Sequence, residues 1–176
     1  MRRRINILVV LAGMLIPSLS TLGQTLNYKM ESLYVYNFTK YIDWPANDNS
    51  TEFVIGVYGN SPLTEELNRS VAGKHVGFRT ISVKVFKTLD EAMKCQILFI
   101  PTSESGNLKK MTDELKGKPI LVVCEKEGLC RKGASISIFL DDDDDFKTKF
   151  EMNKNSIESN GLVVSKMLIR LATQSN

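Results

Sequence analysis

The chain has 176 residues, of which 43% are hydrophobic and 24% are charged. This balance fits a globular protein and excludes a disordered one. The formal net charge is +3, but three basic residues, Arg2 to Arg4, stand at the very start. Without residues 1–23 the chain has 20 basic and 20 acidic residues. We therefore expect no basic surface that would attract nucleic acid.

The first 23 residues have the pattern of a secretory signal peptide. Arg2–Arg4 precede an apolar run from Ile5 to Ile16, and small or polar residues follow as far as Gly23. The run is shorter than the roughly 20 residues that a membrane-spanning helix needs. We expect cleavage after Gly23 and one secreted domain over residues 24–176, with an uncleaved N-terminal anchor as the alternative.

The part that follows begins with a predicted amphipathic helix over Tyr28–Asp43. Its apolar side chains fall on one face at helical spacing: Met30, Leu33, Tyr34, Phe38, Tyr41 and Ile42. Trp44-Pro45 ends the helix, because proline disfavours helical geometry at the residue before it. Exposed aromatic residues are common anchors at protein interfaces, so Trp44 is a candidate for binding a partner and, equally, for the core.

Strand and helix patterns then alternate. Strands are predicted over residues 53–58, 80–86, 96–100 and 119–124; three are apolar on both faces and the one at 80–86 alternates, as an edge strand does. Helices are predicted to begin at Ser61-Pro62 and at the capping box Thr88–Glu91, and another carries Leu108, Met111 and Leu115. With right-handed crossovers, this predicts a three-layer, doubly wound, mainly parallel α/β sheet of the receiver or flavodoxin type, in the order 2-1-3-4.

The C-terminal part has a different pattern. Two alternating segments, 136–140 and 146–152, flank the five aspartates Asp141–Asp145, which predicts an antiparallel hairpin with an acidic turn. A closing helix is predicted after Asn155, with a buried stripe formed by Ile157, Gly161, Val164, Met167, Leu168 and Leu171. Five consecutive aspartates repel one another and lack the spacing of a calcium loop, so we expect a solvated turn and no metal site.

The residues do not assemble a catalytic site or a cofactor site. His75 is the single histidine, and the sequence places neither an acid nor a nucleophile beside it. The glycines Gly56 and Gly59 are wrongly spaced for a dinucleotide fingerprint. We therefore expect a binding protein without a cofactor, not an enzyme.

A doubly wound sheet binds small ligands in the crevice at the carboxyl ends of its strands. The residues predicted to line that crevice follow the first and third strands: Gly59, Asn60, Ser61, Thr102 and Ser103. Binding of a small molecule there is the second functional hypothesis, and ordinary strand-to-helix turns are the alternative.

Three cysteines are present. Cys124 ends a strand, and Gly128 lets the chain turn back toward Cys130. Because secreted proteins keep disulfides, we expect a Cys124–Cys130 bridge rather than two buried thiols. Cys95 is then either a buried free thiol or a partner in an intermolecular bond.

The ordered set of segments resembles the YfiR-like family of periplasmic proteins. The resemblance covers nearly the whole chain after the leader: Tyr34–Pro45 is similar to the opening helix, 53–59 to the first strand, 96–100 and 119–123 to the next central strands, and 150–153, 161–165 and 168–172 to the closing segments. No single motif decides the match.

The resemblance implies a Gram-negative periplasm. It also implies a regulatory role, since the best-known member inhibits a membrane-bound diguanylate cyclase, the source of cyclic-di-GMP, and its control is sensitive to disulfide state. Cys124 and Cys130 resemble the closely spaced pair of that family. The first functional hypothesis is therefore a module that binds the periplasmic part of an inner-membrane signalling protein, such as a cyclase or a sensor kinase. The oligomeric state stays open, a homodimer included.

Overall fold

The computed structural model describes residues 19–45 and 50–173, with side chains from residue 27 onward. In this part, one seven-stranded sheet has the order β3-β4-β2-β5-β6-β7-β8. Its strands are β2 (Glu52–Tyr58), β3 (His75–Val76), β4 (Arg79–Phe86), β5 (Ile97–Ile100), β6 (Leu121–Glu125), β7 (Ile136–Asp141) and β8 (Lys147–Met152). The five central strands are parallel, while β3 and β8 run antiparallel at the two edges.

The segment β4-β2-β5-β6 confirms the predicted order 2-1-3-4, and β7 and β8 confirm the predicted hairpin. The strand predicted at the edge, β4, has only the two-residue β3 outside it. All four residues of β5 are buried, because strands flank it on both sides and side chains cover both of its faces. The chain is thus a mixed α/β protein with a mainly parallel sheet.

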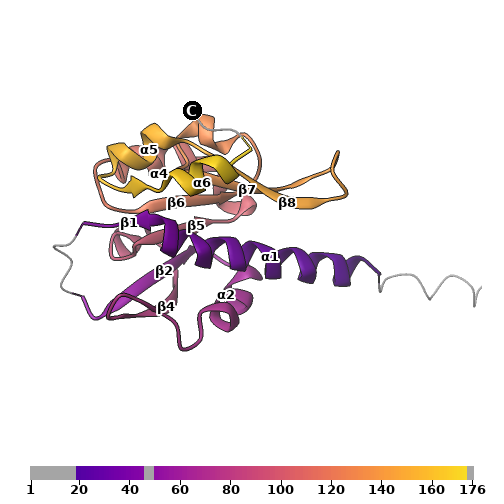
Figure 1. Cartoon of the computed structure of the whole chain (residues 1–176), viewed down its shortest axis with the longest axis horizontal. Helices are drawn as coiled ribbons and strands as arrows, with labels where there is room; N and C mark the ends of the chain where they lie inside the picture. The colour runs from indigo at the N-terminus through magenta and orange to yellow at the C-terminus, as the bar shows by residue number, and fades with distance from the viewer. Residues whose placement is uncertain (1–18, 46–49, 174–176) are drawn as a thin grey trace, which may run out of the picture.

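Helices pack on both faces of the sheet (Figure 1). They are α1 (Leu19–Tyr41), α2 (Leu63–Val71), α3 (Leu89–Ala92), α4 (Leu108–Glu114), α5 (Lys154–Ser159) and α6 (Lys166–Leu171). One core contains Phe38 of α1 and Leu67 of α2, and the other contains Ala92 of α3 and Met111 of α4. The likeness to receiver or flavodoxin folds stays a prediction.

One of the predicted helix starts has the expected cap. The Thr88 hydroxyl accepts a hydrogen bond from the Glu91 amide at 3.4 Å, and the Glu91 carboxylate accepts one from the Thr88 amide at 3.3 Å. This is the predicted capping box of α3. At α2 the helix begins at Leu63 with Pro62 at the N-cap position, so the predicted cap by Ser61 is wrong; the buried Ser61 hydroxyl still accepts a hydrogen bond from the Leu63 amide at 3.2 Å.

The buried face of α1 is rotated from the predicted one. Met30 and Leu33 are 41% and 39% exposed, so their predicted place in the core is wrong, whereas Glu31 and Val35 are buried. The helix packs between α2 and β8. The face that carries Val35 and Phe38 is therefore the one turned toward the core. The helix also ends at Tyr41, because Ile42–Asp43 form a short strand, β1.

The single closing helix that was predicted is wrong, because the segment forms two short helices. Gly161, with φ +73°, turns the chain after α5, and Val163–Val164 form β9, which pairs antiparallel with β1. Asn153, not Asn155, caps α5 by accepting a hydrogen bond from the Ser156 amide at 2.9 Å. Two members of the predicted stripe, Met167 and Leu171, are each 58% exposed.

Two segments bond to the outer side of β8. The Tyr34 hydroxyl of α1 donates a hydrogen bond to the Thr148 carbonyl at 3.0 Å. The Thr173 amide, after α6, donates to the Phe150 carbonyl at 2.9 Å. The edge strand is thereby held by the opening helix and by the last described residue.

Residues 1–18 of the predicted signal peptide lie outside the described residues, and residues 19–23 begin α1. The cleavage therefore stays a prediction. Among the helices that the structure describes, none has the length and apolar character to cross a membrane.

Candidate functional site

The residues predicted to line a crevice lie at the carboxyl ends of β2 and β5. Asn60 and Ser103 are exposed, whereas Ser61 is buried and its hydroxyl accepts a hydrogen bond from the Leu63 amide. Gly59 has φ +71°, and a side chain there would meet the Glu104 carboxylate at 2.7 Å. The glycine therefore leaves room for an acidic group over the end of β2.

Thr102 links β5 to the next strand of the sheet. Its amide donates a hydrogen bond to Glu125 Oε2 at 3.2 Å, and its hydroxyl donates to the Glu125 carbonyl. Glu125 is the last residue of β6 and is half-buried. Burial raises its pKa, and the hydrogen bond from Thr102 opposes the rise.

Glu31 of α1 is a functional candidate that the sequence analysis missed. It is 1% exposed, and its Oε1 accepts a hydrogen bond from Asn27 Nδ2 at 2.7 Å. Burial, and next the negative charge of Glu125, raise its pKa to about 8, against the lowering effect of Asn27. Burial and then the charges of Glu125 and Glu31 raise the pKa of Tyr28. Two carboxyl groups and a phenol are thus electrostatically coupled at this end of the sheet.

A sequence signal for Glu31 was present. Glu31 precedes Val35 by four residues and Phe38 by seven, so it falls on the helical stripe that these two core residues define. A carboxylate inside such a stripe is unusual unless it is paired or protonated.

The cysteines lie in the opposite core, between β6 and α4. Cys124 is level with Ser137 of β7, and Cys130 Sγ is 3.5 Å from Ser137 Oγ, so both sulfur atoms face the same serine. They are buried thiols that are not joined, and burial raises the pKa of Cys130 to about 12. The predicted Cys124–Cys130 bridge stays a prediction.

Cys95 is a third buried thiol. It is 3% exposed, and it donates a hydrogen bond to the Ala92 carbonyl at 3.0 Å. Burial raises its pKa to about 12, which disfavours the reactive thiolate. Of the two alternatives for Cys95, its position fits a buried free thiol.

Trp44 is half-buried and packs edge-on against Phe53, with 4.9 Å between the ring centroids. Its Nε1 donates a hydrogen bond to the Gln96 carbonyl at 3.2 Å. With Met93 and Ile120 it lines a cavity of about 270 Å³ at the amino ends of β5 and β6. These contacts give Trp44 a structural role, and its role in binding a partner stays a prediction.

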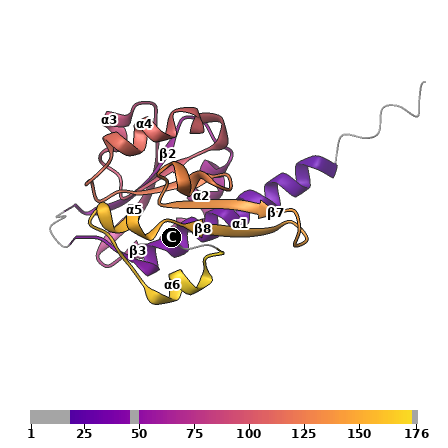
Figure 2. The ribbon, with the colours of Figure 1, turned by 90° about the horizontal axis from the view of Figure 1, so that it is seen from above.

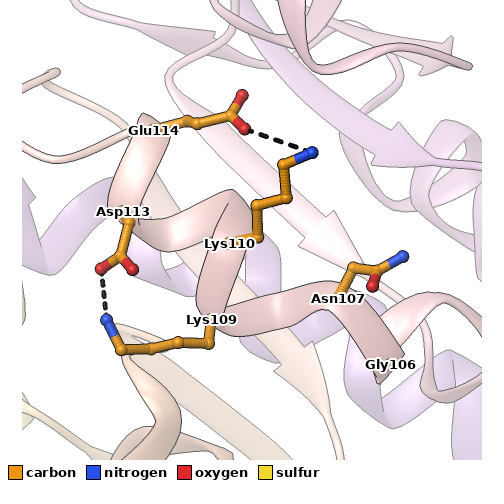
Figure 3. A pocket seen from close by; sticks show the side chains of 6 residues that line it. All are labelled: Gly106, Asn107, Lys109, Lys110, Asp113 and Glu114. Atoms are coloured by element: carbon orange, nitrogen blue, oxygen red, sulfur yellow. Dashed lines mark hydrogen bonds and ion pairs between the residues drawn. The ribbon is translucent and has the colours of Figure 1, made fainter.

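Another hollow, of about 620 Å³, lies on the surface of α4 (Figure 3). Its lining is Gly106, Asn107, Lys109, Lys110, Asp113 and Glu114. Lys109 forms an ion pair with Asp113, and Lys110 forms one with Glu114 at 3.9 Å. In each pair the acidic residue lies one helical turn after the lysine. Such exposed pairs contribute little, and they leave the hollow without a buried polar group that would select a ligand.

The acidic turn is partly neutralised by lysines. Lys149 Nζ lies 2.6 Å from Asp141 Oδ2 and 3.0 Å from Asp144 Oδ2, and Lys147 also pairs with Asp144. No group of three or more acidic, histidine or cysteine side chains that could hold a metal ion occurs within residues 19–45 and 50–173. His75 is exposed in β3.

Comparison with known families gives one match. A family model described as YfiR/HmsC-like matches residues 28–173, which include every helix and strand described above except the first turns of α1. No curated protein matches the chain.

Proposed function

We propose, from the premise that the chain belongs to the YfiR/HmsC-like family, that it is a periplasmic regulator of cyclic-di-GMP signalling. It would bind the periplasmic part of an inner-membrane signalling protein, such as a diguanylate cyclase or a sensor kinase, and inhibit it. Such a regulator acts by binding one conformation of its partner more tightly than another. It needs a partner surface and no catalytic group.

The observation that carries this proposal is the projecting end of the molecule. The β7–β8 hairpin extends beyond the rest of the fold at the same end as the amino-terminal part of α1, as two perpendicular views agree (Figures 1 and 2). The predicted cleavage after Gly23 would shorten α1 at this end and keep its residues from Gln24 onward. Thr148 of the hairpin and Asn27 of the helix are joined by a hydrogen bond of 3.4 Å. The two elements therefore form one continuous projecting surface.

This surface combines apolar and acidic side chains. Phe146, at the hairpin turn, is 66% exposed, and Leu140 and Met30 are 39% and 41% exposed. Asp145 and Phe146 have positive φ values of 49° and 53°, which non-glycine residues adopt at a cost. Such a strained turn that presents an aromatic ring beside aspartates fits an interface with a basic rim on the partner.

The predicted disulfide would belong to the same proposal. A Cys124–Cys130 bridge would tie the turn after β6 to the strand that precedes it. Because Glu151 of β8 accepts a hydrogen bond from the Cys130 amide at 3.2 Å, the state of that turn is connected to the root of the hairpin. The redox state of the pair could then alter how the hairpin is presented.

The test is affinity capture of detergent-solubilised inner-membrane proteins from the source bacterium, with the purified protein as bait. We expect one membrane signalling protein to be enriched, and Phe146→Ala to reduce its recovery about tenfold or more, the loss typical of an aromatic anchor. Phe78→Ala is the matched control, because Phe78 is 76% exposed on the turn between β3 and β4, at the other edge of the sheet. Equal recovery with both variants would remove the hairpin from the interface, and enrichment of no inner-membrane protein would contradict the proposed function.

A further inference from the structure

Glu31 and Glu125 face each other across one end of the sheet. Leu121 and Val123 of β6 belong to the same core as Val35 of α1, and side chains alternate along a strand. Glu125, two residues after Val123, therefore points to the face on which α1 lies. The charge of Glu125 raises the pKa of Glu31, which agrees with this placement.

Glu31 has one oxygen atom without a hydrogen-bond partner. Its Oε1 is occupied by Asn27, whereas its Oε2 is buried and accepts or donates no hydrogen bond within the described part of the chain. A buried carboxyl oxygen without a partner is costly, and an unexplained one is a reason to look for a ligand.

Glu125 and Tyr28 are the ionisable groups that interact electrostatically with Glu31. Glu125 is half-buried, and its Oε2 accepts a hydrogen bond from the Thr102 amide. The phenol of Tyr28 is coupled to both carboxyl groups. An acceptor without a partner therefore belongs to a buried carboxyl group that interacts with a second carboxyl group at the carboxyl end of β6.

We propose that a primary ammonium group binds between the Glu31 and Glu125 carboxylates, with the Tyr28 hydroxyl as a third acceptor. An ammonium group carries a positive charge and three hydrogen-bond donors, which match three oxygen acceptors. Calcium takes six to eight oxygen ligands, more than these side chains provide. The inference concerns a ligand, and it is independent of the membrane partner proposed above.

Binding would exchange a proton for the ammonium. The ligand keeps its three N–H protons, and the Glu31 carboxyl group releases its own proton to the buffer as it becomes a carboxylate. No covalent bond forms. Because the pKa of Glu31 is about 8, the group is mostly protonated at pH 7, and binding at that pH should release close to one proton.

The experiment is calorimetric titration with n-butylammonium at pH 7 in two buffers of different ionisation enthalpy, with 1-butanol as the uncharged probe of the same chain length. An acetylated and amidated Gly-Lys-Gly peptide forms a second arm, which tells a free amine from the lysine of a protein partner. We expect an ammonium probe to bind with release of about one proton, and 1-butanol not to bind.

The variants are Glu31→Gln, Glu125→Gln and, as the control, Glu127→Gln, which changes an exposed glutamate two residues after Glu125. We expect the first two to weaken binding about tenfold or more and the third to leave it unchanged. At pH 7 glutamine replaces a mostly neutral carboxyl group of nearly the same shape, so we expect Glu31→Gln to fold and a loss of binding to report on the missing carboxylate. Absence of binding by both ammonium probes, binding without proton release, or equal binding by Glu31→Gln would each overturn the proposal.

Discussion

Replacement of Glu31 by glutamine should stabilise the protein, and the gain should depend on pH. Glutamine has nearly the same shape and keeps an oxygen that can accept the hydrogen bond from Asn27. It cannot ionise, so it removes the cost of raising the pKa of the carboxyl group on folding. An ordinary surface glutamate would show no such gain.

The magnitude follows from the pKa of Glu31, which rises from 4.5 to about 8 on folding. Because the folded state holds the proton more tightly, the wild-type protein loses stability as pH rises between these two values, and the loss is complete above the higher one. At pH 7 the unfolded glutamate is ionised and the folded one is still mostly protonated. This shift lowers the free energy of unfolding of the wild type by about 3 kcal/mol at pH 7 and by about 5 kcal/mol above pH 8.5. At pH 4 it has almost no effect.

Urea unfolding measures this difference directly, and the single tryptophan, Trp44, provides the fluorescence signal because it packs against Phe53. Glu31→Gln and wild type should have equal free energies of unfolding at pH 4 and should diverge toward pH 8.5. Glu127→Gln should follow the wild type throughout. A difference that is independent of pH, or a variant less stable than wild type at pH 7, would refute the reasoning.

Three further predictions concern the core, a helix cap and the cysteines. Gly56→Ala should destabilise by about 2 kcal/mol, because the new Cβ would lie 2.6 Å from a ring carbon of Phe86; urea unfolding will measure it, and a neutral result would mean that the ring can move aside. Thr88→Ala should cost about 1 kcal/mol through loss of the capping box, whereas Thr88→Ser should cost much less. In protein from an oxidising compartment, thiol labelling after unfolding should detect Cys95 alone if Cys124 and Cys130 are bridged; three labelled thiols would rule the bridge out.

The strands could be predicted from the sequence because their burial is uniform. Runs such as Ile97–Ile100 are apolar on both faces, and this pattern has few explanations other than a central parallel strand. The order of the strands followed from the handedness of crossovers. The Thr88 capping box was predictable because the whole interaction lies within four residues.

The closing segment and the proximity of Glu31 to Glu125 were harder to predict, because contacts between distant parts of the chain determine both. Nothing local tells that Val164 pairs with Ile42, which lies more than a hundred residues earlier, and this pairing converts a helical pattern into two helices and a strand. Glu31 and Glu125 are likewise distant in the chain. Only the packing of α1 across the end of β6 makes them neighbours, although the place of Glu31 in an apolar stripe could have drawn attention to it.

The outer side of β8 has a consequence for solubility. An exposed edge strand offers free carbonyl and amide groups to any other strand, and proteins commonly protect such edges against pairing between molecules. Here the Tyr34 hydroxyl and the Thr173 amide occupy two of the carbonyl groups. The opening helix and Thr173 thus protect the outer edge of β8 against pairing with another strand. Ending the chain at Ala172 would keep the buried residues of α6 and free the Phe150 carbonyl, which would favour association between copies of the protein.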